Sequence, residues 1–278
     1  MADISAAAVK ALRELTNLPM MECKKALTEA GGDQDKAVLI LRQQFAKVQL
    51  KRAENTTTEG KIVIVSREDG SVAVMVELQC ESAPVASNDQ FISLVRQCAN
   101  QLLNGPGASS PDELLDQAAP EVAGKTLRQL WEDLVNQIRE KIVLAKIIRL
   151  DGPVGCYVHH DGKNATVFQA EGGKGQLDIL RDVAMHTTAL KPLCCLADQL
   201  APEAVQAERD RQTADARASG KPDSIVEKIV DGKMKVFFSE QGVLTYQPFA
   251  KDDSKTVSQA LAEHGYKAKA FTRWVLGN

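Results

Sequence analysis

One stretch of the chain decides the fold, Val72-Ala-Val-Met-Val-Glu-Leu-Gln-Cys-Glu-Ser-Ala-Pro-Val-Ala-Ser-Asn-Asp-Gln-Phe91. Its first part, residues 72–79, is an apolar run with the length of a buried strand. Beyond it, apolar residues recur at helical spacing, at Phe91, Leu94, Val95, Cys98 and Leu102. Pro84 stands at the tip of the intervening loop, with Ala83 before it. The stretch therefore predicts a strand, a short loop and a helix.

Around this stretch, strands and helices are grouped rather than strictly alternating. Residues 61–66 predict a strand that leads into a turn at Asp69-Gly70. Helical patterns cover residues 127–138 and 177–190. Between them lie three strand patterns, at residues 143–150, 154–159 and 165–170, with Asp151-Gly152 and Asp161-Gly162 as the hairpin turns. This grouping predicts an α+β fold.

The residues before position 50 predict three short helices. Ser5 is placed to cap the first, Pro19 suits the first turn of the second, and Asp33 caps the third. A polar linker follows at residues 51–60. Near the other end, residues 203–218 and 223–238 predict two polar helices whose small and large apolar residues allow close packing as a helical hairpin.

Composition excludes several classes of protein. Charged residues make up 26% of the chain and the formal net charge is -3, so the basic footprint of a nucleic-acid-binding protein is missing. No apolar run approaches the ~18 residues of a membrane helix, and the first residues do not read as a signal peptide. The 6 cysteines form no C-x-x-C pair, which favours a reduced, cytosolic chain over a zinc site or a disulfide framework. We expect no cofactor, no membrane partner and no direct nucleic-acid partner.

Groups suited to covalent chemistry are sparse. Cys156 lies near His159 and His160, but alternation along a strand puts Cys156 and His159 on opposite faces. Adjacent strand residues point apart, which argues against a metal site at the two histidines. The glycine-rich residues 171–175 lack the spacing of a phosphate-binding loop. The residues alone predict an α+β protein with a helical recognition module that is not an enzyme.

Short motifs spread along the chain form an ordered series. The first is Thr16-Asn-Leu-Pro-Met-Met-Glu-Cys-Lys-Lys-Ala-Leu-Thr-Glu-Ala-Gly-Gly-Asp33. The others are Cys80-Glu-Ser-Ala-Pro-Val-Ala86, Met185-His186, Ser219-Gly-Lys-Pro222, Glu227-Lys-Ile-Val-Asp-Gly-Lys-Met234, Leu244-Thr-Tyr-Gln-Pro-Phe249 and Ser254-Lys-Thr-Val257. The series resembles the elongation factor Ts family, whose first two motifs read T-G-A-G-M-M-D-C-K-K-A-L and C-E-T-D-F-V-A. Each motif alone is modestly specific, but the ordered series is strong evidence for the resemblance.

The resemblance implies a guanine nucleotide exchange factor for elongation factor Tu, the GTPase that delivers aminoacyl-tRNA to the ribosome. Such a protein binds GDP-bound and nucleotide-free elongation factor Tu in the bacterial cytoplasm. It distorts the magnesium and phosphate region of the nucleotide site, so that GDP leaves and GTP enters without covalent chemistry. The implied fold is a ubiquitin-associated-like helical module with its linker at residues 1–55, followed by two related α+β core subdomains. These subdomains cover residues 56–142 and 143–278, and the second includes a projecting antiparallel helical hairpin at residues 203–238.

The resemblance also implies a set of partner-binding residues. They are Met20, Met21, Ser82, Ala83, Pro84, Val85 and His159. For the two methionines, the alternative to partner binding is packing inside the helical module. For His159, the alternative is a solvated position at the end of a strand. For Pro84 the alternative is a rigid turn before a helix capped by Asn88. Met185 and His186 match a family pair for which core packing is favoured, and residues 247–249 match a turn that either anchors the helical hairpin or contacts the partner.

Departures from the family pattern leave two functions open. Ser82-Ala-Pro-Val85 replaces T-D-F-V, so Ala83 and Pro84 supply neither the carboxylate nor the aromatic ring that the family places beside the magnesium site. Asn17-Leu-Pro19 replaces G-A-G, and residues 160–164 replace a glycine-rich turn. One hypothesis is a working exchange factor with a reduced tip. The other is a binding or folding partner of elongation factor Tu with little exchange activity.

Overall fold

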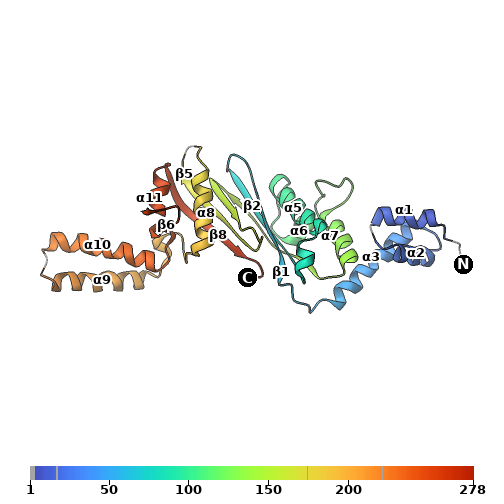
Figure 1. Cartoon of the computed structure of the whole chain (residues 1–278), viewed down its shortest axis with the longest axis horizontal. Coiled ribbons are helices and arrows are strands. Elements are labelled where there is room, and N and C mark those ends of the chain that lie inside the picture. Colours follow the sequence, from blue (N-terminus) through green and yellow to red (C-terminus); the bar gives the residue numbers. More distant parts are fainter. Residues whose placement is uncertain (1–3, 17, 174, 221) are drawn as a thin grey trace. The chain divides into compact units, whose positions relative to one another are not determined.

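The structure is a computed structural model that describes residues 4–16, 18–173, 175–220 and 222–278, and of residues 45–49 it describes the backbone alone. Within these residues the chain is α+β, as the sequence predicts, with three helices followed by small sheets and further helices (Figure 1). Asn17, Lys174 and Lys221, which occur in segments named above, lie outside the described residues.

The helices and strands have the following bounds. The helices are α1 (Ala6–Thr16), α2 (Met20–Glu29), α3 (Gln34–Lys51), α4 (Ala83–Ala86), α5 (Asp89–Asn104), α6 (Pro111–Leu115), α7 (Leu127–Ile138), α8 (Asp178–Leu190), α9 (Pro202–Ala218), α10 (Asp223–Glu240) and α11 (Val257–Ala262). The strands are β1 (Glu59–Ser66), β2 (Val72–Cys80), β3 (Ile142–Asp151), β4 (Val154–Val158), β5 (Asn164–Gly172), β6 (Pro248–Phe249), β7 (Asp252–Thr256) and β8 (Tyr266–Val275). Two 3₁₀ helices cover Ala197–Gln199 and Leu244–Tyr246.

The three N-terminal helices have the caps that the sequence predicts for α1 and α3. The Ser5 hydroxyl accepts a hydrogen bond from the Ala8 N–H at 3.1 Å, and the Asp33 carboxylate accepts one from the Lys36 N–H at 3.0 Å. Such caps satisfy donors that have no partner inside the helix, and each stabilises its helix by about 1 kcal/mol. A small core joins the three helices and comprises Val9, Leu12, Leu18, Cys23, Ala26, Leu27, Ala37 and Leu41.

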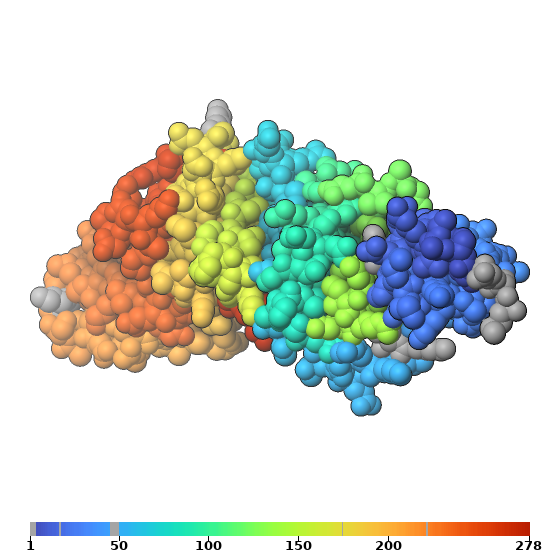
Figure 2. Space-filling view, turned by 45° about the vertical axis from the view of Figure 1, so that its right-hand side comes forward, coloured from blue at the N-terminus to red at the C-terminus, as the bar shows by residue number. Residues whose placement is uncertain are grey.

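The first sheet has the strand order β1-β2-β3, with β2 in the middle. Residues 72–78 of β2 are all buried, which explains why apolar residues predominate in this strand, with Glu77 as its one charged residue. Helices α5, α6 and α7 (teal to green) lie next to one another in Figure 2. The predicted apolar stripe of α5 is buried and comprises Phe91, Leu94, Val95, Cys98 and Leu102. Burying a side chain as large as that of Phe91 contributes roughly 1.5–3 kcal/mol.

One predicted hairpin is wrong. Strand β3 belongs to the first sheet, whereas β4 pairs antiparallel with β5 in a second sheet. Asp151-Gly152 therefore links two sheets and closes no hairpin. The error has a physical cause, because a strand pattern and a turn dipeptide do not specify which strand will be the partner. The hairpin at Asp161-Gly162 is confirmed, with Val158 opposite Ala165.

The second sheet has the order β4-β5-β8, and α8 packs on β4 and β5. The helix approaches the sheet closely at Gly155, where a Cβ atom would lie 2.0 Å from the backbone carbonyl carbon of Leu180. Only glycine fits at this position of β4. The core of this region includes Phe168, Leu180, Val183, Leu244, Phe249, Leu261 and Tyr266.

Helices α9 and α10 confirm the predicted helical hairpin and run antiparallel, side by side (Figure 1). Ala216 on α9 packs with the larger Val226, Val230 and Met234 of α10 in a buried cluster, so small residues meet large ones. An ion pair of 3.2 Å between Arg209 and Asp231 also joins the two helices.

By its internal contacts the chain divides into two compact units. One consists of residues 1–65, 74–149 and 275–278, and the other of residues 66–73 and 150–274. The functional boundaries at residues 55 and 142 stay predictions. Within the described part of the chain, no helix has both the length and the apolar character that crossing a membrane requires.

Candidate partner-binding site

The loop that joins β2 to α5 exposes its tip. Ala83 and Pro84 open the short helix α4 and are exposed to solvent, whereas Val85 behind them is buried. Pro84 lies in the first turn of α4, where the N–H that proline lacks would have no helical partner. The Asn88 side chain caps α5, as predicted, by accepting hydrogen bonds from two backbone N–H groups of the first turn at 2.9 and 3.3 Å. The tip is thus short, exposed and followed by a well-capped helix.

Glu81, immediately before the tip, forms a first anchor. Its carboxylate accepts hydrogen bonds from the Lys141 N–H at 2.5 Å and from the Asn55 amide at 2.8 Å. It also forms an ion pair of 2.7 Å with Arg52. Burial raises the pKa of this carboxyl, but the Lys141 N–H, the Asn55 amide and the Arg52 guanidinium outweigh it and hold the pKa below 4.5. The carboxylate therefore stays ionised at neutral pH and fixes the start of the loop.

Glu140, just after α7, forms a second anchor. Its two carboxylate oxygens accept hydrogen bonds from the Ser82 hydroxyl at 2.6 Å and from the Ser82 N–H at 3.1 Å. The Ser82 carbonyl in turn accepts a hydrogen bond from the Cys80 thiol at 3.3 Å. None of these bonds uses the side chain of Ala83 or Pro84. The two anchors order the loop in advance, so that little conformational entropy is left to lose when the tip binds.

The two methionines of the N-terminal signature lie in the first turn of α2 and face solvent. Met20 is 47% exposed and Met21 is 66% exposed. The alternative that they pack inside the core of the three helices is therefore wrong. Adjacent exposed methionines are typical of protein-binding surfaces, because the flexible thioether adapts to the partner. Contact with a particular partner stays a prediction.

His159 follows the end of β4 and is half-buried. The backbone N–H of His159 donates a hydrogen bond to the Asn164 carbonyl at 2.8 Å, and the His159 backbone carbonyl accepts one from the Gly162 N–H at 2.8 Å. Its Nδ1 lies 3.2 Å from the Tyr157 hydroxyl, and the ring centroid of the exposed His160 is 4.2 Å away. The imidazole is therefore oriented by neighbours and is neither a core residue nor a fully solvated one.

Burial leaves the thiols of Cys80, Cys98 and Cys156 unsuited to nucleophilic chemistry. The 6 cysteines of the chain are all free. Burial raises the pKa of Cys156 to about 11 and the pKa values of Cys80 and Cys98 to about 12. Since the thiolate is the nucleophile, a thiol with such a pKa is nearly unreactive at neutral pH. Cys156, the cysteine nearest to His159 in sequence, is therefore not activated.

His186 is buried, 1% exposed, and organises the turn at residues 247–250. Its Nε2 lies 3.0 Å from Gln247 Oε1, and its Nδ1 accepts a hydrogen bond from the Ala250 N–H at 3.1 Å. This pattern assigns the neutral imidazole with its proton on Nε2. Burial lowers the pKa of His186 below 6.5, and the hydrogen bond that His186 donates to Gln247 raises it by less. The prediction of core packing for His186 is confirmed, and Gln247 anchors the turn.

Sequence reasoning missed both anchors of the loop. A charged residue beside an exposed turn usually indicates a solvated side chain. The partners of Glu81 are also distant in the chain, with Asn55 26 positions away and Lys141 60 positions away. The one local signal is the place of Glu81 directly between a largely buried strand and a loop tip. Met20, Met21 and residues 82–85 belong to one compact unit, and His159 belongs to the other.

A family model and several known relatives show the family of this chain. The family model described as Elongation factor TS matches residues 81–278. Elongation factor Ts of Azoarcus sp. (strain BH72) is 39% identical over 279 residues, which cover 100% of this chain and 92% of the relative. Elongation factor Ts of Paenarthrobacter aurescens (strain TC1) is 38% identical over 285 residues, which cover 100% of both chains. This chain belongs to the elongation factor Ts family.

Proposed function

We propose that this chain binds elongation factor Tu in its GDP-bound and nucleotide-free forms and promotes the exchange of GDP for GTP. The observation that carries the proposal is the similarity to elongation factor Ts along the whole chain. Its role is in translation elongation in the bacterial cytoplasm. It acts through binding and makes or breaks no covalent bond, in keeping with the unreactive thiol of Cys156.

The proposed mechanism centres on the tip at residues 82–85. Ala83 and Pro84 dock beside the magnesium and phosphate region of the partner's nucleotide site, and the buried Val85 supports them from within. The Glu81 and Glu140 anchors already order the loop. The loop therefore loses little conformational entropy when it docks, and most of the binding free energy is retained. That free energy is available to distort the nucleotide site, and each tenfold faster release of GDP needs about 1.4 kcal/mol. By linkage, this chain lowers the affinity of elongation factor Tu for GDP, and GDP lowers the affinity of elongation factor Tu for this chain by the same factor.

Further contacts are proposed at the N-terminal module and at the end of β4. The exposed Met20 and Met21 suit docking of residues 1–55 on the partner. His159, held by Tyr157, suits a contact from the subdomain at residues 143–278. Contacts of this kind are expected to compensate for the small apolar area that the tip can bury.

One observation favours a second function. The tip carries Ala83 and Pro84 where the family pattern has an aspartate and a phenylalanine. The second candidate is therefore a protein that holds elongation factor Tu, or assists its folding, with little effect on nucleotide release.

Release of a fluorescent GDP analogue from the cognate elongation factor Tu separates the two functions. We expect substoichiometric amounts of this chain to accelerate release, and the double variant Met20→Ala/Met21→Ala to need higher concentrations for the same rate. Leu39→Ala is the matched control, because Leu39 is an exposed apolar residue of the same module, 56% exposed on α3. A stable complex whose GDP release equals that of elongation factor Tu alone would establish the second function.

A further inference from the structure

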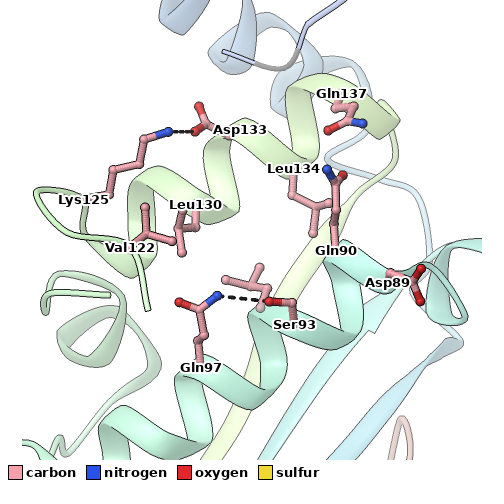
Figure 3. A pocket seen from close by; sticks show the side chains of 11 residues that line it. Asp89, Gln90, Ser93, Gln97, Val122, Lys125, Leu130, Asp133, Leu134 and Gln137 are labelled. Atoms are coloured by element: carbon pink, nitrogen blue, oxygen red, sulfur yellow. Dashed lines mark hydrogen bonds and ion pairs between the residues drawn. The ribbon is translucent and has the colours of Figure 1, made fainter. Parts of the chain in front are cut away.

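A cavity of about 440 Å³ lies between α5 and α7. Its volume is within the roughly 300–1,000 Å³ that is typical of small-molecule sites. Leu94 on α5, Leu130 and Leu134 on α7, and Val122 before α7 give it an apolar lining. In Figure 3, Val122, Leu130 and Leu134 project into the space between the two helices. The cavity has the apolar walls that a ligand with a hydrophobic body requires.

Gln97 gives this cavity an unsatisfied polar group. The residue is only 5% exposed, and its Nε2 donates a hydrogen bond to the Ser93 hydroxyl at 3.1 Å. Its Oε1 is buried and has no hydrogen-bond partner among the described residues. A buried carbonyl oxygen without a donor is costly, and native proteins rarely leave one unexplained. Figure 3 shows the Gln97 amide on the α5 wall of the cavity. Because less than 1 Å² of Oε1 is accessible while the cavity is empty, a bound molecule with an N–H or O–H group would satisfy this oxygen after a rotation of the amide toward the cavity.

The charges around the cavity limit the kind of ligand. Among the described residues that line it, Asp89 and Asp133 are acidic and Lys125 is basic. Lys125 is already paired with Asp133 at 2.7 Å. The N-terminus of α5, which would attract an anion, is already capped by Asn88. The surplus negative charge disfavours phosphates and carboxylates, and favours a neutral or cationic molecule.

We propose that this cavity binds a small amphipathic ligand, neutral or positively charged, whose N–H or O–H group donates to Gln97 Oε1. The hydrophobic body of the ligand packs against Leu94, Leu130 and Leu134. The proposal concerns binding alone and holds whether or not the chain accelerates nucleotide exchange. It assigns the cavity to a molecule that is neither a nucleotide nor a free phosphate.

A series of probes with one hydrophobic body and different head groups tests the assignment. Binding of 2-phenylethanol, phenethylamine, ethylbenzene and phenylacetate to the full chain is measured by titration of ¹H–¹⁵N NMR spectra. We expect the alcohol and the amine to bind more tightly than ethylbenzene, and phenylacetate to bind most weakly. The signals that move should include the Gln97 side-chain amide and the backbone of Leu130 and Leu134.

Two variants and a control locate the binding. Gln97→Met keeps the side-chain length but removes the acceptor. It should weaken binding of the alcohol and the amine about three- to tenfold and leave binding of ethylbenzene unchanged. Leu130→Trp fills the cavity and should abolish binding of all the probes. Gln43→Met makes the same chemical change at an exposed position of α3 outside the cavity and should change nothing.

Three results would overturn the proposal. The first is the absence of shifts with every probe up to its solubility limit, which would leave the cavity to solvent. The second is phenylacetate binding as tightly as phenethylamine. The third is equal affinity of the wild type and Gln97→Met for the alcohol. If Gln97→Met does not fold, the wild-type preference for 2-phenylethanol over ethylbenzene decides the role of the acceptor.

Discussion

The loop at residues 81–88 and the turn at residues 247–250 are both held by a polar side chain, but one is charged and the other is neutral. Glu81 holds the loop as an ionised carboxylate, because the donors around it outweigh the effect of burial. His186 holds the turn as a neutral imidazole, because burial disfavours its protonated form. Both pKa values are below the ordinary ones. The same direction of shift therefore keeps one group charged and the other uncharged, and only the surrounding contacts show which applies.

The largest effect is expected from breaking the neutral anchor. His186→Ala removes a buried ring and leaves Gln247 Oε1 and the Ala250 N–H without their partner. We expect the free energy of unfolding to fall by about 3 kcal/mol, measured by chemical denaturation. His160→Ala, at an exposed histidine, should change it by less than about 0.5 kcal/mol. A loss at His186 no larger than at His160 would contradict the anchoring role.

Breaking the charged anchor should cost somewhat less, because Glu81 is partly solvated. Glu81→Gln keeps the shape but places an amide donor among the donors of Lys141, Asn55 and Arg52. We expect a loss of about 2 kcal/mol in the free energy of unfolding and faster amide hydrogen exchange at residues 82–88. Glu68→Gln, at an exposed position, is the matched control. Unchanged hydrogen exchange in the loop would show that the anchor does not order the tip.

Changing the tip while keeping both anchors should act on function and spare stability. Ala83→Asp with Pro84→Phe restores the carboxylate and aromatic ring of the family pattern. We expect about tenfold faster GDP release from an elongation factor Tu whose own exchange factor carries T-D-F-V, and little gain or a clash with the cognate partner. Tenfold corresponds to about 1.4 kcal/mol, which is part of what burying a phenylalanine contributes.

Pro84→Gly serves as the companion of this swap. It keeps the tip small but frees its backbone, and should slow exchange modestly. If neither partner responds to the swap and Pro84→Gly also has no effect, the loop is only a turn, and exchange must depend on other parts of the chain.

The smallest effect separates the two anchors by pH. The pKa of His186 is lowered on folding, so the unfolded chain binds its proton first and stability is lost as the pH falls below about 6.5. The pKa of Glu81 is also lowered, and its contribution is lost only as the pH falls below about 4.5. Hydrogen exchange measured from pH 7 downward should therefore loosen residues 247–250 before the loop at residues 81–88. His186→Phe should remove the first step alone, and simultaneous loosening of both segments would refute the separation.

The sequence predicts the elements well where a local pattern determines them. The apolar run of β2, the stripe of α5 and the caps at Ser5 and Asn88 all depend on neighbours within a few residues. The pairing of β3 was mispredicted because it depends on which distant strand offers an edge. The anchors of the loop were missed for a similar reason, since Glu81 and Glu140 find their partners far along the chain. The tip residues were predicted from the resemblance and stay a prediction, whereas the contacts that hold the loop were not predicted.

The way in which Glu140 grips Ser82 has a consequence for how this segment can evolve. The Glu140 carboxylate accepts hydrogen bonds from the backbone N–H and the hydroxyl of Ser82. The Ser82 carbonyl accepts a hydrogen bond from the Cys80 thiol. The contacts that hold Ser82 therefore do not depend on which side chains stand at positions 83 and 84. Because the side chains of Ala83 and Pro84 are exposed, we expect substitutions at these two positions to have little effect on folding. We therefore expect the loop around Ala83 and Pro84 to accept the tip residues of distant relatives when these are grafted into it.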